Sequence, residues 1–360
     1  MKVVFSNASP NLGGAELMTE RLALGFRDRG HEVVLFCRSS SPLHERLQGE
    51  IPCEPILRGF DMHPVTVWRC WRALRRHRPH LLLATTPKDP RLAGPAARVL
   101  GIPVIMRESL DHPYKDRLHY RIFYGWVPAR FIANSESTRR TILGSAPWVG
   151  EADITVIYNG IPVEDYLRAS PVDLGLPAGA VVVGFVGRFE PRKGIGELAE
   201  AWPRIAAAVP NAHLVIAGRG PHEAVFRASL AGVPRVHWLG FREDIPALMR
   251  ALDILLVPSH WEGFGLVAVE ALAAGTPPVV TRASSLPELV ADGVEGRLIP
   301  VRDSVALADA AIELARDPAL RDRMGRAGRE RSQREFTVQR MLEQYENIFD
   351  QVVKEHERTS

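Results

Sequence analysis

The chain has 360 residues, which is long for one domain and suits two. Hydrophobic residues make up 46% and charged residues 24%, the balance of a globular protein with ample core-forming material. A formal net charge of only +3 argues against nucleic acid as a partner, although it leaves room for a local basic face.

The cysteines and the apolar runs bear on the compartment. Cys37, Cys53 and Cys70 are widely spaced and form no CxxC pair or metal-like spacing, so we expect reduced thiols. The N-terminal apolar run of about three residues is far shorter than a signal-peptide core of ~7–15. No stretch approaches the ~18 apolar residues of a membrane span. These features predict a cytoplasmic protein that can touch the inner face of a membrane.

Short apolar runs alternate with longer amphipathic segments along the whole chain, which predicts parallel sheets covered by helices on both faces. Helices are expected at Ala15–Arg29 and Val65–His77, among others. The expected strands of the first half are Val3–Ser6, Glu32–Phe36, Leu81–Ala84, Val104–Met106, Phe131–Asn134 and Thr155–Ile157. Those of the second half are Val181–Val186, His213–Ala217, Val236–Leu239, Ile254–Val257 and Pro278–Val280.

A segment rich in Pro, Gly and Ala, Tyr166–Ala180, marks the expected seam between two domains. We therefore predict an N-terminal Rossmann-like domain over residues 1–168 and a second over residues 169–335. Residues 336–360 are predicted to form a C-terminal helix that packs back on the first domain.

In the first domain, the loop NLGGAE lies between the first strand and the first helix. Gly13 and Gly14 there leave room for a ligand over the helix N-terminus, although a tight turn also favours glycine. Two further segments, Val67–His80 and Tyr114–Arg130, mix Trp, Tyr or Phe with Arg at helical spacing. Such helices could lie on an anionic membrane surface, or could pack their aromatic residues inward and leave the arginines solvated.

In the second domain, Arg188 and Lys193 follow a buried strand and precede a helix expected near Gly194. The order Lys193–Gly194–Ile195 does not fit a P-loop, which needs Gly-Lys-Ser/Thr. No G-x-G-x-x-G fingerprint opens the first βα unit, which argues against a nicotinamide or flavin dehydrogenase. Gly218 ends another strand and is expected in the wall of a nucleotide pocket, where a plain turn is the alternative.

The stretch Ile254–Val280 contains the most informative motif, EGFGLVAVE. Gly263 and Gly265 precede a helix whose N-terminus suits a phosphate or diphosphate. Glu270 then falls about one to one and a half turns into that helix, roughly 6–8 Å from the phosphate, where a carboxylate can accept both hydroxyls of a ribose. Glu262 precedes the helix, on the side where a donor sugar would lie. The alternative is a solvated loop glutamate and an ordinary helix-surface charge.

The segment EGFGLVAVEALAAGTPPVV resembles the Glu-x7-Glu signature of the family-4 retaining glycosyltransferases, which have the GT-B fold of two Rossmann-like domains facing a central cleft. The segments VVVGFVGRFEPRKG and WLGFREDIPALMRALDILLVPS resemble that family too, and GGAE, ANSESTRR and IYNGIP match it more loosely. The resemblance implies transfer of a sugar from a nucleoside-diphosphate sugar to a hydroxyl of a saccharide or lipid-linked acceptor.

The resemblance also assigns roles to residues. Arg188, Lys193 and Glu262 are the expected catalytic residues, and the two cations would neutralise the diphosphate leaving group. With that charge neutralised and no Asp-x-Asp site, neither a metal nor another cofactor is expected. The expected nucleotide-sugar-binding residues are Gly187, Gly218, Gly263, Phe264, Gly265, Leu266 and Glu270.

On the acceptor side, the resemblance suggests Gly13 and Gly14, together with a histidine after a strand in the middle of the first domain. Here Arg107, Glu108 and Ser109 stand in that place, and His112 follows a few residues on. We expect one of the first three to replace the histidine. Another GT-B activity, such as a sugar-nucleotide epimerase or a phosphorylase, and a non-catalytic sugar-nucleotide-binding protein remain the alternatives.

Overall fold

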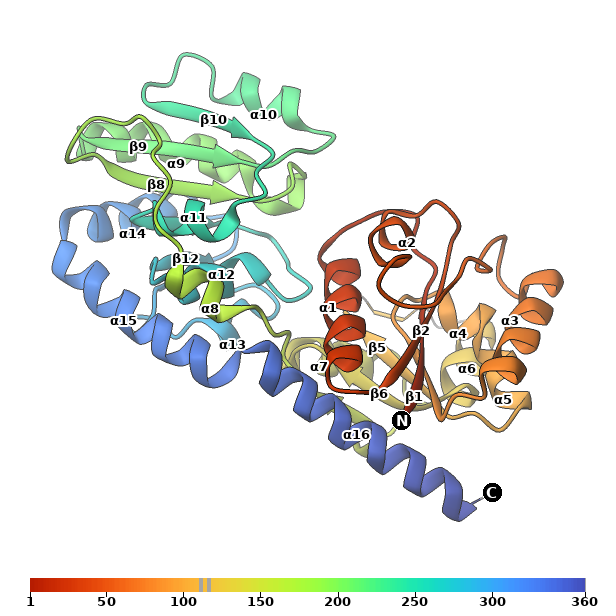
Figure 1. The fold of residues 1–360 in the computed structure, drawn as a ribbon. Helices are drawn as coiled ribbons and strands as arrows, with labels where there is room; N and C mark the ends of the chain where they lie inside the picture. Colours follow the sequence, from red (N-terminus) through yellow and green to blue (C-terminus); the bar gives the residue numbers. More distant parts are fainter. Residues whose placement is uncertain (110–112, 115–117, 360) are drawn as a thin grey trace. The chain divides into compact units, whose positions relative to one another are not determined.

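The computed structural model describes residues 1–109, 113–114 and 118–359, and the chain divides into two compact units (Figure 1). Unit 1 comprises Met1–Asn159 and Val338–Ser360, and unit 2 comprises Gly160–Thr337. The boundary precedes the predicted one after residue 168. The reason is that helix α8 (Val163–Arg168) packs on helices of unit 2.

Unit 1 contains a seven-stranded sheet in the order β3-β2-β1-β4-β5-β6-β7, with every described strand pair parallel. Its strands are β1 (Lys2–Asn7), β2 (Glu32–Cys37), β3 (Cys53–Glu54), β4 (Leu81–Ala84), β5 (Val104–Glu108), β6 (Pro128–Ala133) and β7 (Ile154–Val156). Its helices are α1 (Gly14–Asp28), α2 (Pro42–Leu47), α3 (Pro64–His77), α4 (Asp89–Leu92), α5 (Gly94–Val99), α6 (Leu118–Trp126), α7 (Glu136–Ser145), the 3-10 turn η1 (Glu151–Asp153) and α16 (Val338–Thr359).

Unit 2 contains a six-stranded parallel sheet in the order β10-β9-β8-β11-β12-β13. Its strands are β8 (Val181–Val186), β9 (Ala212–Ala217), β10 (Val236–Gly240), β11 (Ile254–Val257), β12 (Pro278–Thr281) and β13 (Arg297–Ile299). Besides α8, its helices are α9 (Ile195–Ala208), α10 (Glu223–Ser229), α11 (Ile245–Arg250), α12 (Leu266–Ala274), α13 (Leu286–Leu289), α14 (Ser304–Arg316) and α15 (Pro318–Glu335), with the 3-10 turn η2 (Pro191–Lys193).

Continuous apolar runs form the central strands because both faces of each sheet are covered. Successive strand residues point to opposite faces, yet Val3, Val4 and Phe5 of β1 are all fully buried. The doubly wound architecture predicted from the sequence is confirmed, and each predicted strand is present with its ends shifted by no more than three residues. Strands β3 and β13 were not predicted.

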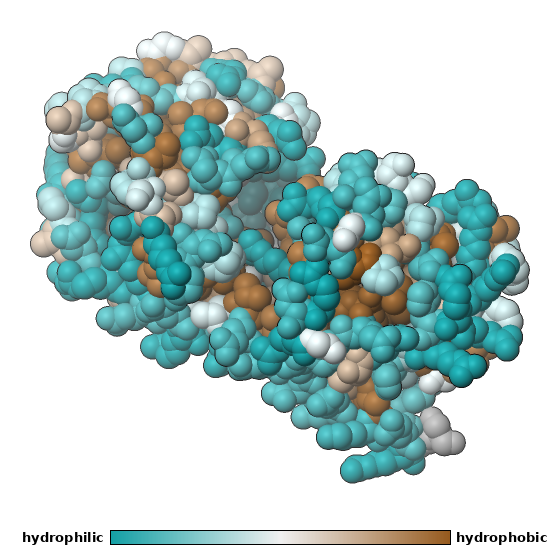
Figure 2. Space-filling model, viewed as in Figure 1, coloured by the Kyte–Doolittle hydropathy of each residue, from teal (hydrophilic) through white to brown (hydrophobic). Residues whose placement is uncertain are grey.

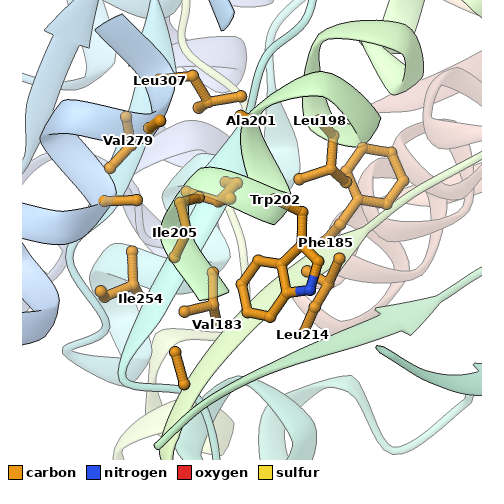
Figure 3. Close-up of a cluster of buried hydrophobic side chains, with 14 of the residues drawn as sticks. Val183, Phe185, Leu198, Ala201, Trp202, Ile205, Leu214, Ile254, Val279 and Leu307 are labelled. Carbon is orange, nitrogen blue, oxygen red and sulfur yellow. The ribbon is translucent and has the colours of Figure 1, made fainter. Parts of the chain in front are cut away.

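The core of unit 2 shows how a helix covers the sheet. Ile195, Leu198, Trp202 and Ile205 recur at helical spacing on α9 and are buried against β8, β9 and β11 (Figure 3). The Trp202 indole N–H donates to the carbonyl of Pro234 at 3.0 Å, so its polar atom is satisfied inside the core.

In both sheets the strand order reverses beside the first strand of the unit. This switch point lies between β1 and β4 in unit 1 and between β8 and β11 in unit 2. Open α/β sheets bind ligands in the crevice beyond the carboxyl ends of the strands at such a point. The loops that follow these four strands are therefore the places to search for function.

Replacement of Trp202 by alanine is expected to destabilise the protein by about 3–5 kcal/mol, because it leaves a large cavity under the sheet. Thermal or denaturant unfolding measures this. The matched control is Trp126→Ala, since Trp126 is 48% exposed and its loss should change stability by less than about 0.5 kcal/mol. Equal destabilisation by the two variants would contradict this description of the core.

Candidate functional site

The loops after β8 and β11 meet at the switch point of unit 2 through a buried ion pair. Lys193 Nζ lies 2.6 Å from Glu262 Oε1, and the two side chains are 14% and 6% exposed. The Ser259 hydroxyl donates to the same carboxylate oxygen at 2.7 Å. Two residues predicted to be catalytic are thus in direct contact, and Ser259 was not predicted.

A second cation approaches the same carboxylate. Arg192 Nη1 is 3.7 Å from Glu262 Oε2, and its guanidinium stacks over the Trp261 ring at 4.6 Å. Arg192 also donates to Glu190 at 2.8 Å, and Arg188 pairs with the other oxygen of Glu190 at 2.9 Å. Glu190 therefore pairs with two guanidinium groups. The Arg188 side chain is 57% exposed, so it could contact a ligand as well.

The partners Glu190, Arg192 and Trp261 were missed from the sequence. The sequence indicated only that charged residues are dense in RFEPRK, residues 188–193. It did not indicate which of these charged side chains form ion pairs. The same holds for His260, whose ring pairs with Glu197 of α9 at 2.8 Å. The His260 backbone N–H also donates to the carbonyl of Arg192 at 2.7 Å, so the two loops are joined by the main chain as well.

Glycines allow the loops of unit 2 to approach so closely. Gly194 has φ +70°, and a Cβ there would lie 1.8 Å from the carbonyl oxygen of Pro258. Gly218 has φ +145°, and its Cβ would lie 1.9 Å from the carbonyl oxygen of Gly187. Both positions combine a left-handed backbone with main-chain contact, which only glycine permits.

Helix α12 begins at Leu266, directly after the EGFG loop. Its N-cap is Gly265, which has φ +86° and no side chain to bond the first N–H groups, and the first turn has no acidic residue. Phe264 is buried, and its carbonyl accepts the Ser285 hydroxyl at 2.8 Å, while Gly263 and Leu266 are half-buried. The helix N-terminus therefore keeps its partial positive charge for an anion.

Glu270 is the fifth residue of α12 and is half-buried. One helical turn separates it from Leu266, the spacing that the sequence predicted for a ribose contact. Its binding role stays a prediction.

At the switch point of unit 1, Gly13 is the N-cap of α1 and Gly14 is the first helical residue. The backbone N–H of Gly13 donates to Glu16 Oε2 at 2.9 Å, so a carboxylate already occupies this helix start. Glu108, at the end of β5, is buried and accepts the Tyr114 hydroxyl at 2.7 Å.

Arg107 does not suit the acceptor-side role expected of it. Its side chain is 1% exposed, and it donates to the Tyr345 hydroxyl at 3.0 Å and to Asn159 Oδ1 at 2.9 Å. A third donation goes to the Ser109 hydroxyl. The guanidinium is thus used to hold β5 to α16 inside unit 1. His112 lies outside the described residues.

Among the described residues, no three His, Cys, Asp or Glu side chains are grouped so that they could hold a metal ion. Nor does any helix there have the length and apolar character needed to cross a membrane.

Two family models match the chain. The model "Glycosyltransferase Family 4" matches residues 12–165, and "Glycosyl transferases group 1" matches residues 168–331. Together they leave out only residues 1–11, 166–167 and 332–360. The second match contains every residue of the candidate site in unit 2.

Among related proteins, the phosphatidyl-myo-inositol mannosyltransferase of Mycobacterium leprae is 38% identical over 55% of this chain and 53% of its own length. The chain thus aligns with about half of that relative. The N-acetyl-alpha-D-glucosaminyl L-malate synthase of Bacillus anthracis is 25% identical over 96% of both chains. Among solved structures, Anabaena Alr3699/HepE in complex with UDP and glucose superposes with a TM-score of 0.83 at 24% identity, over 98% of this chain and 100% of that one. This likeness confirms the GT-B fold.

Replacement of Gly194 by alanine is expected to destabilise unit 2. The strained φ alone costs about 1–3 kcal/mol, and the clash with Pro258 adds to it. The control is Gly196→Ala two residues on, where a Cβ meets nothing within 4 Å and should stabilise α9 by about 0.5–1 kcal/mol. Thermal unfolding would compare the two variants, and opposite changes in stability are expected.

Proposed function

This chain belongs to the family-4 glycosyltransferases, and we propose that it moves a sugar from a nucleoside-diphosphate sugar to a hydroxyl of a saccharide or lipid-linked acceptor, with retention of anomeric configuration. The observation that carries the proposal is the buried Lys193–Glu262 pair at the switch point of unit 2. It lies beside an uncapped helix N-terminus and an exposed arginine, the combination that a nucleotide sugar requires.

The diphosphate lies at the N-terminus of α12, where the N–H groups after Gly265 point toward it. Arg188 and Lys193 supply positive charge from the loop after β8. Negative charge grows on the leaving diphosphate as the sugar bond breaks, so preorganised cations stabilise the transition state more than the ground state. Glu270 accepts hydrogen bonds from the ribose hydroxyls on the other side.

Glu262 accepts hydrogen bonds from hydroxyls of the transferred sugar. Lys193 and Ser259 fix this carboxylate in position, so binding does not have to order it. No protein general base is assigned, because in this mechanism the leaving phosphate takes the proton of the acceptor hydroxyl on the same face. With these charges in place we expect activity without a metal ion or other cofactor.

The relatives illustrate how wide the choice of acceptors is. The printed name of the Mycobacterium leprae protein indicates a phospholipid acceptor, and that of the Bacillus anthracis protein indicates malate. Alr3699/HepE was crystallised with UDP and glucose. The family matches favour neither the epimerase nor the phosphorylase alternative. A thermal-shift panel of uridine, guanosine and adenosine diphosphates with their sugars would identify the donor.

The proposal of a lipid-linked acceptor is supported by one surface of unit 1, formed by the basic and aromatic residues of α3 and α6. Both helices pack on α4, so they cover the same side of the sheet. The exposed apolar residues of these two helices are Val65, Trp68, Leu118, Ile122 and Trp126, and Phe60 and Met62 are exposed in the loop before α3. Figure 2 shows hydrophobic residues interspersed with hydrophilic ones on unit 1.

Cations border these apolar residues. The guanidinium of Arg72 lies over Trp68 at 5.7 Å, and that of Arg98 lies over Trp126 at 5.9 Å. Arg75, Arg76 and His77 end α3. Interfacial tryptophan beside arginine suits an anionic leaflet, where each cation contributes about 1 kcal/mol. In this proposal the protein works in the cytoplasm, peripherally at the inner face of the membrane.

Replacement of Glu262 by alanine is expected to lower kcat by about 10²–10³-fold, because it removes a contact made at the reacting sugar. Slow hydrolysis of the donor should fall in parallel. Glu200→Ala removes an exposed glutamate of α9 and should leave both rates unchanged. Excess EDTA should also leave wild-type turnover unchanged. Tight donor binding without turnover in the wild type would refute the proposed function.

The double variant Trp68→Ser/Ile122→Ser is expected to weaken binding to vesicles containing anionic lipid by about tenfold or more, since each lost apolar side chain removes roughly 1.5–3 kcal/mol of burial. Vesicle sedimentation at low and high salt measures this, and wild-type binding should weaken with salt. Val225→Ser, at an even more exposed position of unit 2, is the control. Equal vesicle binding by all three proteins would exclude this face.

A further inference from the structure

A buried carboxylate shapes the turn after β4 in unit 1. Asp89, the first residue of α4, is fully buried. Its Oδ2 accepts the backbone N–H groups of Thr85 at 3.1 Å and Thr86 at 2.7 Å. The side chain thus closes the turn over residues 85–88, whose tip, Pro87 and Lys88, is exposed.

Hydrogen bonds connect this turn to the loop after β1. The Thr85 hydroxyl donates to the carbonyl of Ser6 at 2.8 Å and accepts Asn7 Nδ2 at 2.9 Å. Asn7 Oδ1 in turn accepts the backbone N–H of Ser9 at 3.1 Å. Asn7 and Thr85 are both buried. The series Asp89–Thr85–Asn7 therefore fixes two loops relative to each other.

These two loops flank the switch point of the unit 1 sheet. The turn 85–88 follows β4, and the loop 8–13 follows β1 and leads to Gly13 at the start of α1. Adjacent carboxyl ends at a switch point form the ligand crevice of an open sheet. The exposed groups that these loops present include Lys88, Asn11 and Leu12.

The carboxylate is held at a cost in stability. Asp89 Oδ1 and the hydroxyls of Ser6 and Thr86 have no well-aligned hydrogen bond within the described part of the chain. Burial raises the pKa of Asp89 to about 6, although hydrogen bonding by Thr86, Ser6 and Thr85 opposes this. A half-satisfied buried carboxylate is a poor stabiliser compared with an apolar residue, so its presence calls for another reason.

We propose that Asp89 is a positioning residue that, through Thr85 and Asn7, holds the loops 8–13 and 85–88 in the shape that receives the acceptor. The inference rests on the proposed function, since it assigns the acceptor to this switch point. Asp89 contacts no substrate in this view and acts only through the loops.

Two further titratable groups face Asp89. Burial raises the pKa of Cys70 of α3 to about 12 and also raises the pKa of Tyr124 of α6. Because the folded pKa of Asp89 lies above its ordinary value, the folded state binds this proton more tightly than the unfolded chain. The resulting stability is present at low pH and is lost as pH rises through about 6.

The test compares Asp89→Ala, Asp89→Asn and Thr85→Val. Alanine leaves the Thr86 amide without its acceptor and the Thr85 amide with only the carbonyl of Ser6, at 3.0 Å. Asparagine keeps an acceptor oxygen for both amides. Thr85→Val cuts the connection to Asn7. The control is Thr66→Val, which also removes a buried threonine hydroxyl from unit 1, one that donates to the carbonyl of Arg58 at 2.7 Å.

Asp89→Ala and Thr85→Val are expected to lower kcat/KM for the acceptor by about ten- to hundredfold, mostly through KM, and to leave donor hydrolysis unchanged. Asp89→Asn should retain acceptor KM. Its melting temperature relative to wild type should rise between pH 4.5 and pH 7, because it lacks the titrating proton. Thr66→Val should change stability alone.

Hydrogen exchange makes the test independent of activity. In Asp89→Ala, amide exchange should accelerate both in residues 84–88 and in residues 8–13, and in Thr85→Val it should accelerate in residues 8–13. Unchanged exchange in the distant loop, or an equal loss of donor hydrolysis and acceptor transfer, would overturn the inference. If the wild type transfers no sugar, the proposed function fails, while the exchange data still decide whether Asp89 orders the loops.

Discussion

The ion pair between Lys193 and Glu262 is the constraint on which the site of unit 2 depends. The two residues are 69 positions apart and join the loops of β8 and β11. Burying two charges usually costs as much as their attraction returns, so such a pair adds little stability. Its geometry nevertheless requires several supports, namely the glycine at 194, the backbone bond from His260 to Arg192, and the His260–Glu197 pair. The Lys193–Glu262 pair itself adds little stability. The contacts around it therefore indicate that these two side chains are held in a defined position.

The two switch points have opposite electrostatic character, although their sheets have the same topology. In unit 2, Arg192 and Lys193 approach Glu262 and Arg188 pairs with Glu190, near an uncapped helix start. In unit 1, the start of α1 is already capped by Glu16, and the buried ionisable groups include Asp89 and Glu108. The diphosphate of the proposed donor therefore suits the first switch point, and the hydroxyl-bearing acceptor that we propose suits the second. The two units thus share a strand arrangement, and the differences between their switch points come from the loops.

The architecture could be predicted from the sequence because both faces of the sheets are covered, which produces long apolar runs that are easily recognised. Strands β3 and β13 have only two and three residues and were missed, although β7, which also has three, was predicted. In the site, the spacing of glycines and charges together with the family resemblance pointed to Glu262, Gly265 and Lys193, and the structure brings Glu262 and Lys193 into contact while their roles stay predictions. Glu190, Ser259 and Trp261 could not be identified, since their partners are set by how two loops approach in space. Asp89 was missed for a related reason: in the sequence it is one aspartate in a turn, and only its burial distinguishes it.

Arg107 was expected in the acceptor site, but its contacts in the structure are those of a residue that holds unit 1 together. The resemblance suggested that a residue near the end of β5 replaces a sugar-binding histidine. Arg107 was one of the three candidates, but its guanidinium bonds to Tyr345, 238 positions away, on the helix that returns to unit 1. A buried guanidinium whose donors bond to Tyr345, Asn159 and Ser109 cannot also reach a ligand without leaving those groups unsatisfied. Glu108 is likewise buried, whereas Ser109 is half-buried, so Ser109 is the residue at this strand end with surface left for a hydroxyl contact. A serine there offers only one neutral side-chain group. In our proposal, the loops after β1 and β4 therefore make most of the contacts to the acceptor.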